Sequence, residues 1–208
     1  MIGSIYADLN QLSILLKKLG NNLNFLNEII CVVSGVNTAD KLSELSKLKK
    51  FVKINLEIIS LEKIVFPGQA RNIGILKSKS NYICFLDSHP LPNENWLSNS
   101  IKILEDANLR GVLGRTKYIG INEFEKCFIC ATYGNYPLFT VQGTLIEKNL
   151  LHEIGFFIPN NRSGEDAEWL LRSKAFNSKF KQKKVIPLSY VGLKGKNLFD
   201  LCKKWYCY

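Results

Sequence analysis

Asp87 and His89 stand two residues apart, where an apolar run gives way to a proline and a polar loop. A carboxylate oxygen and a neutral imidazole nitrogen both suit a divalent cation such as Mn²⁺ or Mg²⁺. On an extended chain end, two side chains at this spacing can face the same ion. The alternative is a turn that the aspartate caps, with the histidine exposed beside it. Spacing alone leaves both interpretations open.

The elements that must position this pair alternate between strand and helix. Apolar runs predict strands at residues 2–7, 28–33, 54–59 and 82–87. Leucines at helical spacing, a possible threonine cap and a proline in a first turn predict helices at 9–20, 38–51 and 67–78. This order predicts an α/β fold, with a parallel sheet flanked by helices. Ligands bind such sheets outside the carboxyl ends of the strands, where Asp87, His89 and Ser34 would lie.

The second half of the chain has a less regular pattern. It predicts helices at 93–107 and 163–176, strands at 111–120 and 183–193, and a strand that runs into a helix over 138–157. Glu165 and Asp166 fall in the first turn of a predicted helix, where the helix dipole favours carboxylates. We find no repeat, low-complexity tract or linker in the sequence, which predicts a single domain over residues 1–208.

The chain is basic, with 28 Lys and Arg against 18 Asp and Glu. Its basic clusters, at 47–50, 179–184 and 193–196, favour anionic partners such as phosphorylated donors, acidic glycans or a lipid surface. Nucleic acid is disfavoured, because no aromatic platform is interleaved with the basic residues. The amphipathic stretch 197–208 predicts either a helix on the surface of an anionic membrane or a truncated chain.

Cysteine usage and the N-terminal sequence predict a cytoplasmic protein, with peripheral attachment at the inner face of the membrane as a further expectation. No apolar run reaches the roughly 18 residues of a membrane span, and the start lacks the pattern of a secretion signal. Cys31 and Cys84 lie in apolar strand-like runs, which predicts buried, reduced thiols. Cys127 and Cys130 form a lone C-x-x-C, for which we expect packing within a helix rather than zinc binding.

Two blocks of the sequence resemble family 2 glycosyltransferases of the GT-A fold. The first is GQARNIGILKSKSNYICFLDSH followed by NENWL, and the second is VQGTLIEKNLLHEIGFF followed by SGEDAEWLLR. Their order and spacing agree with the family over residues 68–172. The resemblance implies a Rossmann-like GT-A domain, with a nucleotide-binding half of about 1–92 and an acceptor half of about 93–208.

The resemblance also implies an activity and roles for individual residues. The activity would be transfer of a sugar from a nucleotide-diphosphate donor to a hydroxyl of a glycan, lipid-linked or polypeptide acceptor. Asp87 corresponds to the first aspartate of the family's metal motif, and His89 takes the place of the direct metal ligand. Asp166 matches the general base of inverting members, with Glu165 beside it as a second catalytic candidate. Arg71 corresponds to an arginine near the nucleotide.

The sequence departs from the family pattern at three places. Asp-Ser-His replaces Asp-x-Asp and is similar to the motif of the polypeptide N-acetylgalactosaminyltransferases, which retain anomeric configuration. Ser34 stands where the family has an aspartate for the nucleotide base, with Asp8 as a possible substitute. Tyr190 lies near the place of a C-terminal histidine. The residues expected to bind the donor are Arg71, Asp87, Ser34 and Gly68. The competing hypotheses are a retaining enzyme and a non-catalytic GT-A-like module that binds nucleotide, glycan or a partner enzyme.

Overall fold

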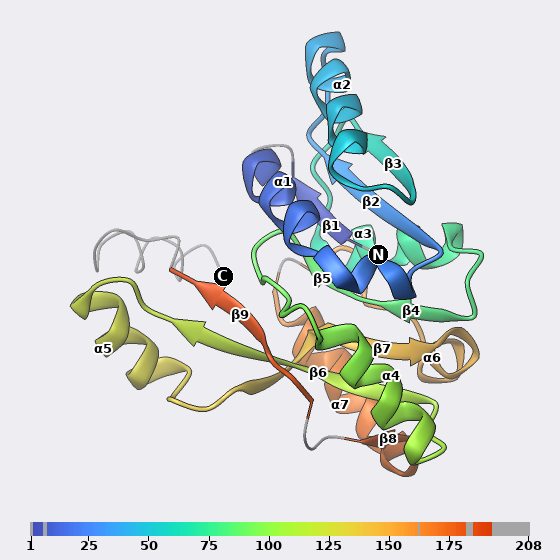
Figure 1. Ribbon diagram of the computed structural model, residues 1–208, viewed down its shortest axis with the longest axis vertical. Helices are drawn as coiled ribbons and strands as arrows, with labels where there is room; N and C mark the ends of the chain where they lie inside the picture. Colours follow the sequence, from blue (N-terminus) through green and yellow to red (C-terminus); the bar gives the residue numbers. More distant parts are fainter. Residues whose placement is uncertain (1, 6–7, 162, 182–184, 193–208) are drawn as a thin grey trace.

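The structure is a computed structural model that describes residues 2–5, 8–161, 163–181 and 185–192. The amphipathic stretch 197–208, the basic cluster 193–196 and residues 182–184 lie outside these ranges, so the expectations made for them stay predictions. Two sheets adjoin in the described part of the chain, and an arm formed by β6, β9 and α5 extends from one of them (Figure 1).

The first sheet is parallel throughout, as the sequence predicts. Its strand order is β3-β2-β1-β5, and the strands are β3 (Asn55–Leu61), β2 (Glu28–Ser34), β1 (Ile2–Ile5) and β5 (Leu86–Asp87). Alternate side chains of β2 are buried in different clusters. Cys31 and Val33 pack with the leucines of α1 (Leu9–Lys18), whereas Ile30 and Val32 pack with α3 (Pro67–Lys77). Both faces of the strand are thus covered, which explains its continuous apolar run.

Helices α2 (Ala39–Ser46) and α3 begin where their capping signals indicate. Thr38 precedes α2, and its side chain accepts a hydrogen bond from the backbone N–H of Lys41 at 3.4 Å. Pro67 occupies the first turn of α3, where a missing N–H costs nothing. Short 3₁₀ turns, η2 (Gly20–Phe25) and η3 (Lys47–Phe51), follow α1 and α2.

The predicted strand 82–87 is two strands that belong to different sheets. β4 (Tyr82–Cys84) pairs antiparallel with β7 (Leu138–Glu147), whereas β5 continues the parallel sheet beside β1. Between them, the backbone of Phe85 bonds to β7: its N–H donates to the Thr144 carbonyl at 3.1 Å, and its carbonyl accepts from Gly143 N–H at 2.7 Å. The expectation of one continuous strand is therefore wrong, because pairing changes partner at Phe85.

The second sheet is mixed and contains most of the second half of the chain. Its strand order is β4-β7-β6-β8 with β9 also on β6, where β6 is Gly111–Ile119, β8 is Phe180–Lys181 and β9 is Leu188–Val191. The remaining elements are α4 (Trp96–Asp106), α5 (Glu123–Thr132), α6 (Lys148–Ile154), α7 (Glu165–Ser173) and η4 (Lys174–Lys179). Trp169 of α7 packs on Phe85 and Phe157, with ring centroids 6.4 and 5.3 Å away.

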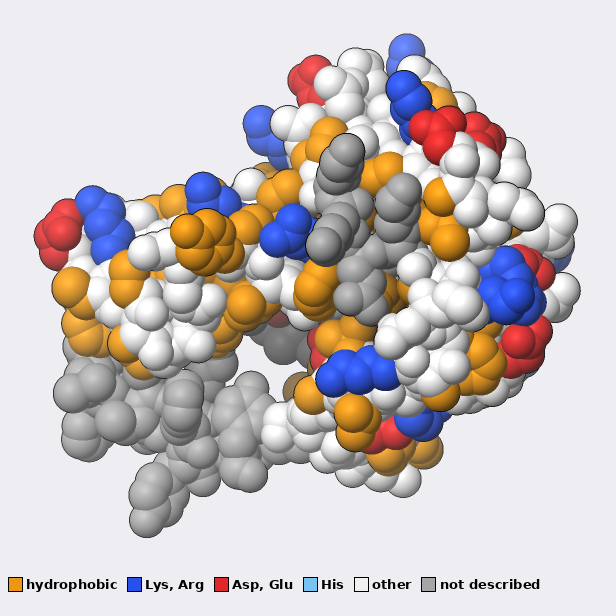
Figure 2. All heavy atoms as spheres, turned by 90° about the horizontal axis from the view of Figure 1, so that it is seen from below, with side chains coloured by type: hydrophobic (Ala, Val, Ile, Leu, Met, Phe, Trp, Pro, Cys, Tyr) orange, Lys and Arg blue, Asp and Glu red, His pale blue; other side chains and the backbone are white. Residues whose placement is uncertain are grey.

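The cysteines and basic residues give a mixed outcome. Cys31 is fully buried, as expected, and Cys84 is partly buried. Cys127 and Cys130 lie on α5 but are exposed, so the expectation that their side chains are used for helix packing is wrong. On the face shown in Figure 2, Lys and Arg side chains are scattered rather than gathered in one patch. Within the described ranges, none of the helices has the length and apolarity needed to cross a membrane.

Candidate active site

One buried guanidinium joins the two sequence blocks. Arg71, on α3, is 1% exposed, and its Nη2 lies 3.2 Å from both carboxylate oxygens of Asp87 at the end of β5. Its Nη1 lies 3.4 Å from Glu165 Oε1 and also contacts Asp166 Oδ1, both in the first turn of α7. The carboxylates that the sequence placed in separate motifs therefore all contact the guanidinium group of Arg71.

Packing between α3 and the segment before α7 fixes this arrangement. The Asn72 side chain donates to the Phe157 carbonyl at 2.7 Å and accepts from the Phe157 N–H at 3.0 Å. The Arg71 guanidinium lies over the Phe157 ring, 5.2 Å from its centroid. A Cβ at Gly68 would come within 2.8 Å of the Ile158 carbonyl oxygen. Gly68 thus allows close packing of α3, and the donor contact expected from the sequence stays a prediction.

The balance of charges determines the protonation of Asp166. Burial raises the pKa of this carboxyl, Arg71 lowers it, and the neighbouring carboxylates of Asp87 and Glu165 raise it again, giving a value of about 6. Burial also opposes the charge on Arg71, but the three carboxylates outweigh it and hold the arginine pKa above its usual range. Asp166 is therefore ionised at neutral pH, yet a far better proton acceptor than an ordinary aspartate.

Gln142 is a residue of this cluster that the sequence analysis missed. It projects from β7, and its Nε2 donates to Asp87 Oδ2 at 2.5 Å. The one available signal was an amide side chain within the strand, immediately before the glycine at position 143. That glycine has φ +82° and would carry a Cβ only 3.2 Å from Leu188. Asp87 is thus held from two sides, by Arg71 and by Gln142.

His89 is positioned by contacts on its two ring nitrogens and on one face. Its Nδ1 lies 3.1 Å from Ser88 Oγ, and its Nε2 lies 3.8 Å from Asp8 Oδ1. Its ring stacks on Tyr190, with centroids 5.7 Å apart and planes 13° apart. Tyr190, which the sequence placed near the position of a family histidine, is thus beside the candidate metal ligand.

An aromatic row continues from Tyr190 towards the arm. Tyr118 lies 5.3 Å from the Tyr190 ring and stacks on Tyr133 at 4.1 Å. Burial raises the pKa of Tyr118, and the nearby tyrosines and the carboxylates of Asp166 and Asp87 raise it further. The sequence does not single out Tyr118 or Tyr133, because β6, β9 and the end of α5 come together only in the fold.

The predicted site residues differ in their access to a ligand. Ser34, at the end of β2, and Arg71 are each 1% exposed, and the side chain of Glu165 is 8% exposed. These three are placed to support the site rather than to touch a substrate in this conformation. The accessible side chains are those of Asp166, Asp87 and His89, at 32%, 26% and 19% exposure.

The donor atoms fit a divalent ion that shares its coordination with phosphate. Among the described residues, no group of three or more His, Cys, Asp or Glu is placed to hold a metal by itself. Asp87 and His89 nevertheless follow the same strand end and offer oxygen and nitrogen atoms to solvent. Ions of the Mg²⁺ and Mn²⁺ type commonly bind to one or two protein groups and complete their shell with phosphates and water.

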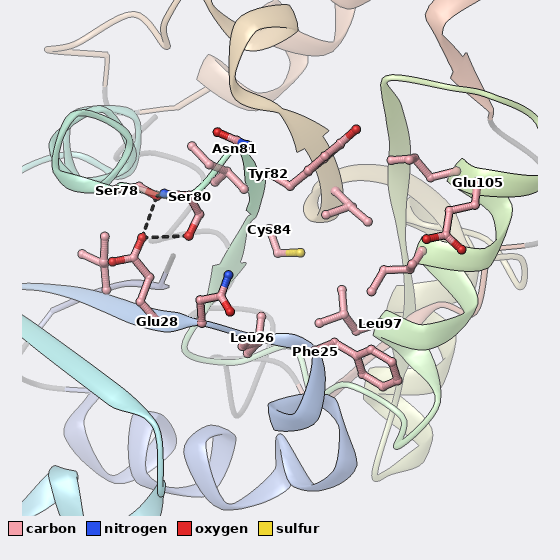
Figure 3. A pocket seen from close by; sticks show the side chains of 16 residues that line it. Phe25, Leu26, Glu28, Ser78, Ser80, Asn81, Tyr82, Cys84, Leu97 and Glu105 are labelled. Atoms are coloured by element: carbon pink, nitrogen blue, oxygen red, sulfur yellow. Dashed lines mark hydrogen bonds between the residues drawn. The ribbon is translucent and has the colours of Figure 1, made fainter.

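A separate cavity of about 500 Å³ lies near the amino-terminal end of β2 (Figure 3). Its apolar wall includes Phe25, Leu26, Ile30, Ile83, Leu97, Ile101, Leu104 and Leu145. Glu28, at the start of β2, borders it and accepts hydrogen bonds from Ser78 and Ser80, both at 3.0 Å. The residues that line it do not include Arg71, Asp87, His89, Glu165 or Asp166. It is not part of the candidate active site.

Sequence comparisons identify relatives of this chain. Residues 5–167 match the model of the family described as Glycosyl transferase family 2. An uncharacterized glycosyltransferase of Rickettsia bellii (strain RML369-C) is 32% identical over 152 residues, which are 66% of this chain and 21% of the relative. A second, from Rickettsia felis (strain ATCC VR-1525 / URRWXCal2), is 30% identical over 67% of this chain and 24% of its own length. The chain thus spans less than a quarter of either relative.

Solved structures share the fold. S. aureus TarS 1-349 in complex with UDP-GlcNAc superposes with a TM-score of 0.66 and 19% identity, covering 94% of this chain and 58% of TarS 1-349. The mannosyltransferase PcManGT from Pyrobaculum calidifontis, in complex with GDP-Man and Mn²⁺, gives a TM-score of 0.62 and 13% identity over 90% of this chain and 56% of its own. The α/β architecture predicted from the sequence is confirmed.

Proposed function

Because this chain belongs to glycosyl transferase family 2, we propose that it transfers a sugar from a nucleotide-diphosphate donor to an acceptor hydroxyl, with inversion at the anomeric carbon. The observation that carries the proposal is the partly buried Asp166 carboxylate, with its pKa of about 6, bound to the same arginine as Asp87. The nucleotide sugars bound by TarS and PcManGT support the donor class.

Asp166 acts as the general base in this proposal. It takes the proton of the acceptor hydroxyl as the oxygen attacks the anomeric carbon, and the bond from that carbon to the diphosphate breaks with its electrons on the departing oxygen. Arg71 holds Asp166 Oδ1 and Asp87 at once, so it fixes the base relative to the donor side of the site. Glu165 is enclosed behind Arg71 and serves as a positioning residue.

Asp87 and His89 would hold a divalent ion, Mn²⁺ or Mg²⁺, against the donor diphosphate. When bound, the ion would offset the negative charge that develops on the leaving group. This assignment rests on the donor chemistry and exposure of the two side chains. Direct incubation with UDP-, GDP- and dTDP-sugars and Mn²⁺, with release of the nucleotide as the readout, tests the activity and identifies the donor.

His89→Ala is expected to lower Mn²⁺-dependent affinity for the donor nucleotide at least tenfold, because it removes the nitrogen ligand of the ion. EDTA should have the same effect on the unmodified protein. Isothermal titration calorimetry with and without metal measures both. His152→Ala is the matched control, since His152 is the chain's other histidine and lies exposed on α6. Equal nucleotide binding with and without metal would return His89 to the role of a turn residue.

The pH dependence of transfer is expected to follow the Asp166 carboxyl. Its base form is lost as the pH falls through about 6, so kcat/KM should decline on the acid side of that value. Removing the Arg71 charge should move this limb to higher pH, because the arginine lowers the pKa of Asp166. A profile that stays flat from neutral pH down to about pH 4, the range of an ordinary aspartate, would remove Asp166 from the role of base.

A retaining reaction is the second candidate, favoured by the histidine in the metal motif. In that case Asp166 would not deprotonate the acceptor, and its replacement would have little effect on rate. Peripheral attachment to an anionic membrane, a cytoplasmic location and the choice among glycan, lipid-linked and polypeptide acceptors stay predictions from the sequence.

A further inference from the structure

Strand β7 departs from regular pairing close to Asp87. Val112 and Gly114 are two positions apart on β6, whereas their partners on β7, Leu145 and Thr140, are five positions apart. The extra residues of β7 form a bulge. Bulges turn a side chain away from the direction that a regular strand would give it, and they are frequent next to active sites.

Hydroxyl groups and glycines hold this bulge in place. Thr144 Oγ1 donates to the Thr140 carbonyl at 3.1 Å and accepts from the Gly114 N–H at 2.9 Å. Gly143 has φ +82°, a backbone conformation that favours glycine. A Cβ at Gly114 would come within 2.0 Å of the Gln142 carbonyl oxygen, so the two strands can approach this closely only with glycine there.

The bulge directs the Gln142 side chain to Asp87. The Gly143 N–H donates to the carbonyl of Phe85 at 2.7 Å, which bonds the bulge to the segment that leads into Asp87. Gln142 Nε2 donates to Asp87 Oδ2 at 2.5 Å. The reverse orientation of the amide would place two acceptor oxygens against each other, so the N–H must face the carboxylate.

The other end of the Gln142 amide has no partner. Its Oε1 is buried and accepts no hydrogen bond within the described ranges. Burying an acceptor in this way carries a penalty that an apolar side chain of similar size would avoid. Packing therefore does not explain a glutamine at this position. What the amide adds over an apolar group is the N–H that it donates to Asp87.

The two oxygens of Asp87 are engaged unequally as a result. Among the described residues, Oδ2 accepts from both Arg71 and Gln142, whereas Oδ1 accepts from Arg71 alone, at 3.2 Å. Two donors on one oxygen keep the carboxylate from turning over, and Oδ1 stays the oxygen with more unused lone-pair capacity. The Asp87 side chain is 26% exposed, so it can offer that oxygen to a ligand.

We propose that Gln142 is a positioning residue of the donor site, which holds Asp87 so that Oδ1 faces the nucleotide-diphosphate donor. This inference rests on the proposed function and adds to it a residue with no role in the sequence analysis. Gln142 acts on donor binding rather than on proton transfer, because the carboxylate that it holds is Asp87 and not Asp166.

Gln142→Met separates this role from a structural one, because stability and donor binding should not fall together. Methionine has a similar length and leaves no acceptor unpaired, so the variant should unfold at the same temperature as the unmodified protein or higher. Without the N–H, affinity for the nucleotide sugar that the unmodified protein binds most tightly should fall about tenfold. Isothermal titration calorimetry with Mn²⁺ present measures it. Gln11→Met, at an exposed position on α1, is the matched control and should change neither quantity.

Thr144→Val tests whether the bulge acts through Gln142. This variant removes the hydroxyl that bonds Thr140 and Gly114. It should weaken donor binding when Gln142 is present and have no further effect on binding in the Gln142→Met background. An equal loss of donor affinity in both backgrounds would overturn the link between the bulge and Asp87.

Two results with Gln142→Met would overturn the proposal itself. One is unchanged donor affinity, and the other is a parallel loss of stability and affinity, which would make Gln142 a structural support. Absence of nucleotide binding by the unmodified protein would overturn the proposal together with the proposed function.

Discussion

Replacement of Asp166 by asparagine is expected to lower sugar transfer by a factor of about one hundred or more. The amide cannot accept the acceptor proton, although it keeps the size and the hydrogen-bonding oxygen of the carboxylate. Donor binding should be unchanged, because Asp87 and His89 are untouched. Single-turnover measurement of transfer, alongside calorimetric measurement of nucleotide affinity, separates the chemical step from binding.

The Asp166→Asn variant should fold at least as stably as the unmodified protein. Burial and the neighbouring carboxylates already raise the pKa of this group to about 6, so removing its charge relieves repulsion around Arg71. Glu168→Gln is the matched control, since Glu168 lies in the same helix but pairs with Arg172. It should transfer sugar normally.

Three outcomes would redirect the interpretation. A fully active Asp166→Asn variant would favour the retaining reaction. Loss of transfer in Glu165→Gln at normal stability, with Asp166→Asn active, would move the role of base to Glu165 despite its burial. Nucleotide binding by all variants with no transfer even by the unmodified chain, across UDP-, GDP- and dTDP-sugars, would favour the binding module.

Replacement of Arg71 by methionine is expected to cost about 3 kcal/mol or more of folding stability at neutral pH. Methionine fills much of the volume, but three carboxylates then face one another without their shared cation. Without the arginine, the pKa values of these groups rise in the folded state above their unfolded values. Stability should therefore fall as the pH rises from about 4, where they are protonated. Urea unfolding at several pH values measures the difference.

Arg110 supplies the control for this effect. It also bonds two carboxylates, Glu147 at 2.7 Å and Glu153 at 2.9 Å, but at the surface. Arg110→Met should cost only a small fraction of the loss in Arg71→Met, because exposed ion pairs contribute little. A loss of the same size in both variants, or one that does not shrink in acid, would show that the burial of the Arg71 cluster has no special energetic role.

The first sheet could be predicted because its signals are local. Each of its strands is a short apolar run, and each helix between them has its own cap or leucine spacing, as Thr38 and Pro67 illustrate. The division of residues 82–87 could not be predicted. An apolar run records burial but not which neighbour it pairs with, and Phe85 is equally buried on either assignment.

The candidate site was predictable in part for a similar reason. Asp87 and Asp166 each belong to a recognisable sequence motif, so both could be predicted as residues of the site. The burial of Arg71 and its contacts to both depend on packing between α3 and α7, which no local pattern records. Gln142 was missed because its partner is 55 residues away in the sequence.

The sharing of one arginine among three carboxylates gives the site a charge opposite to that of the protein. The chain carries a formal net charge of +10, yet the Arg71 cluster holds more anionic than cationic groups, and Asp8 stands nearby. A phosphorylated molecule is thus attracted to the protein from a distance and repelled at the last few ångströms. Only a phosphate whose charge is already compensated can bind beside the Arg71 cluster without that cost.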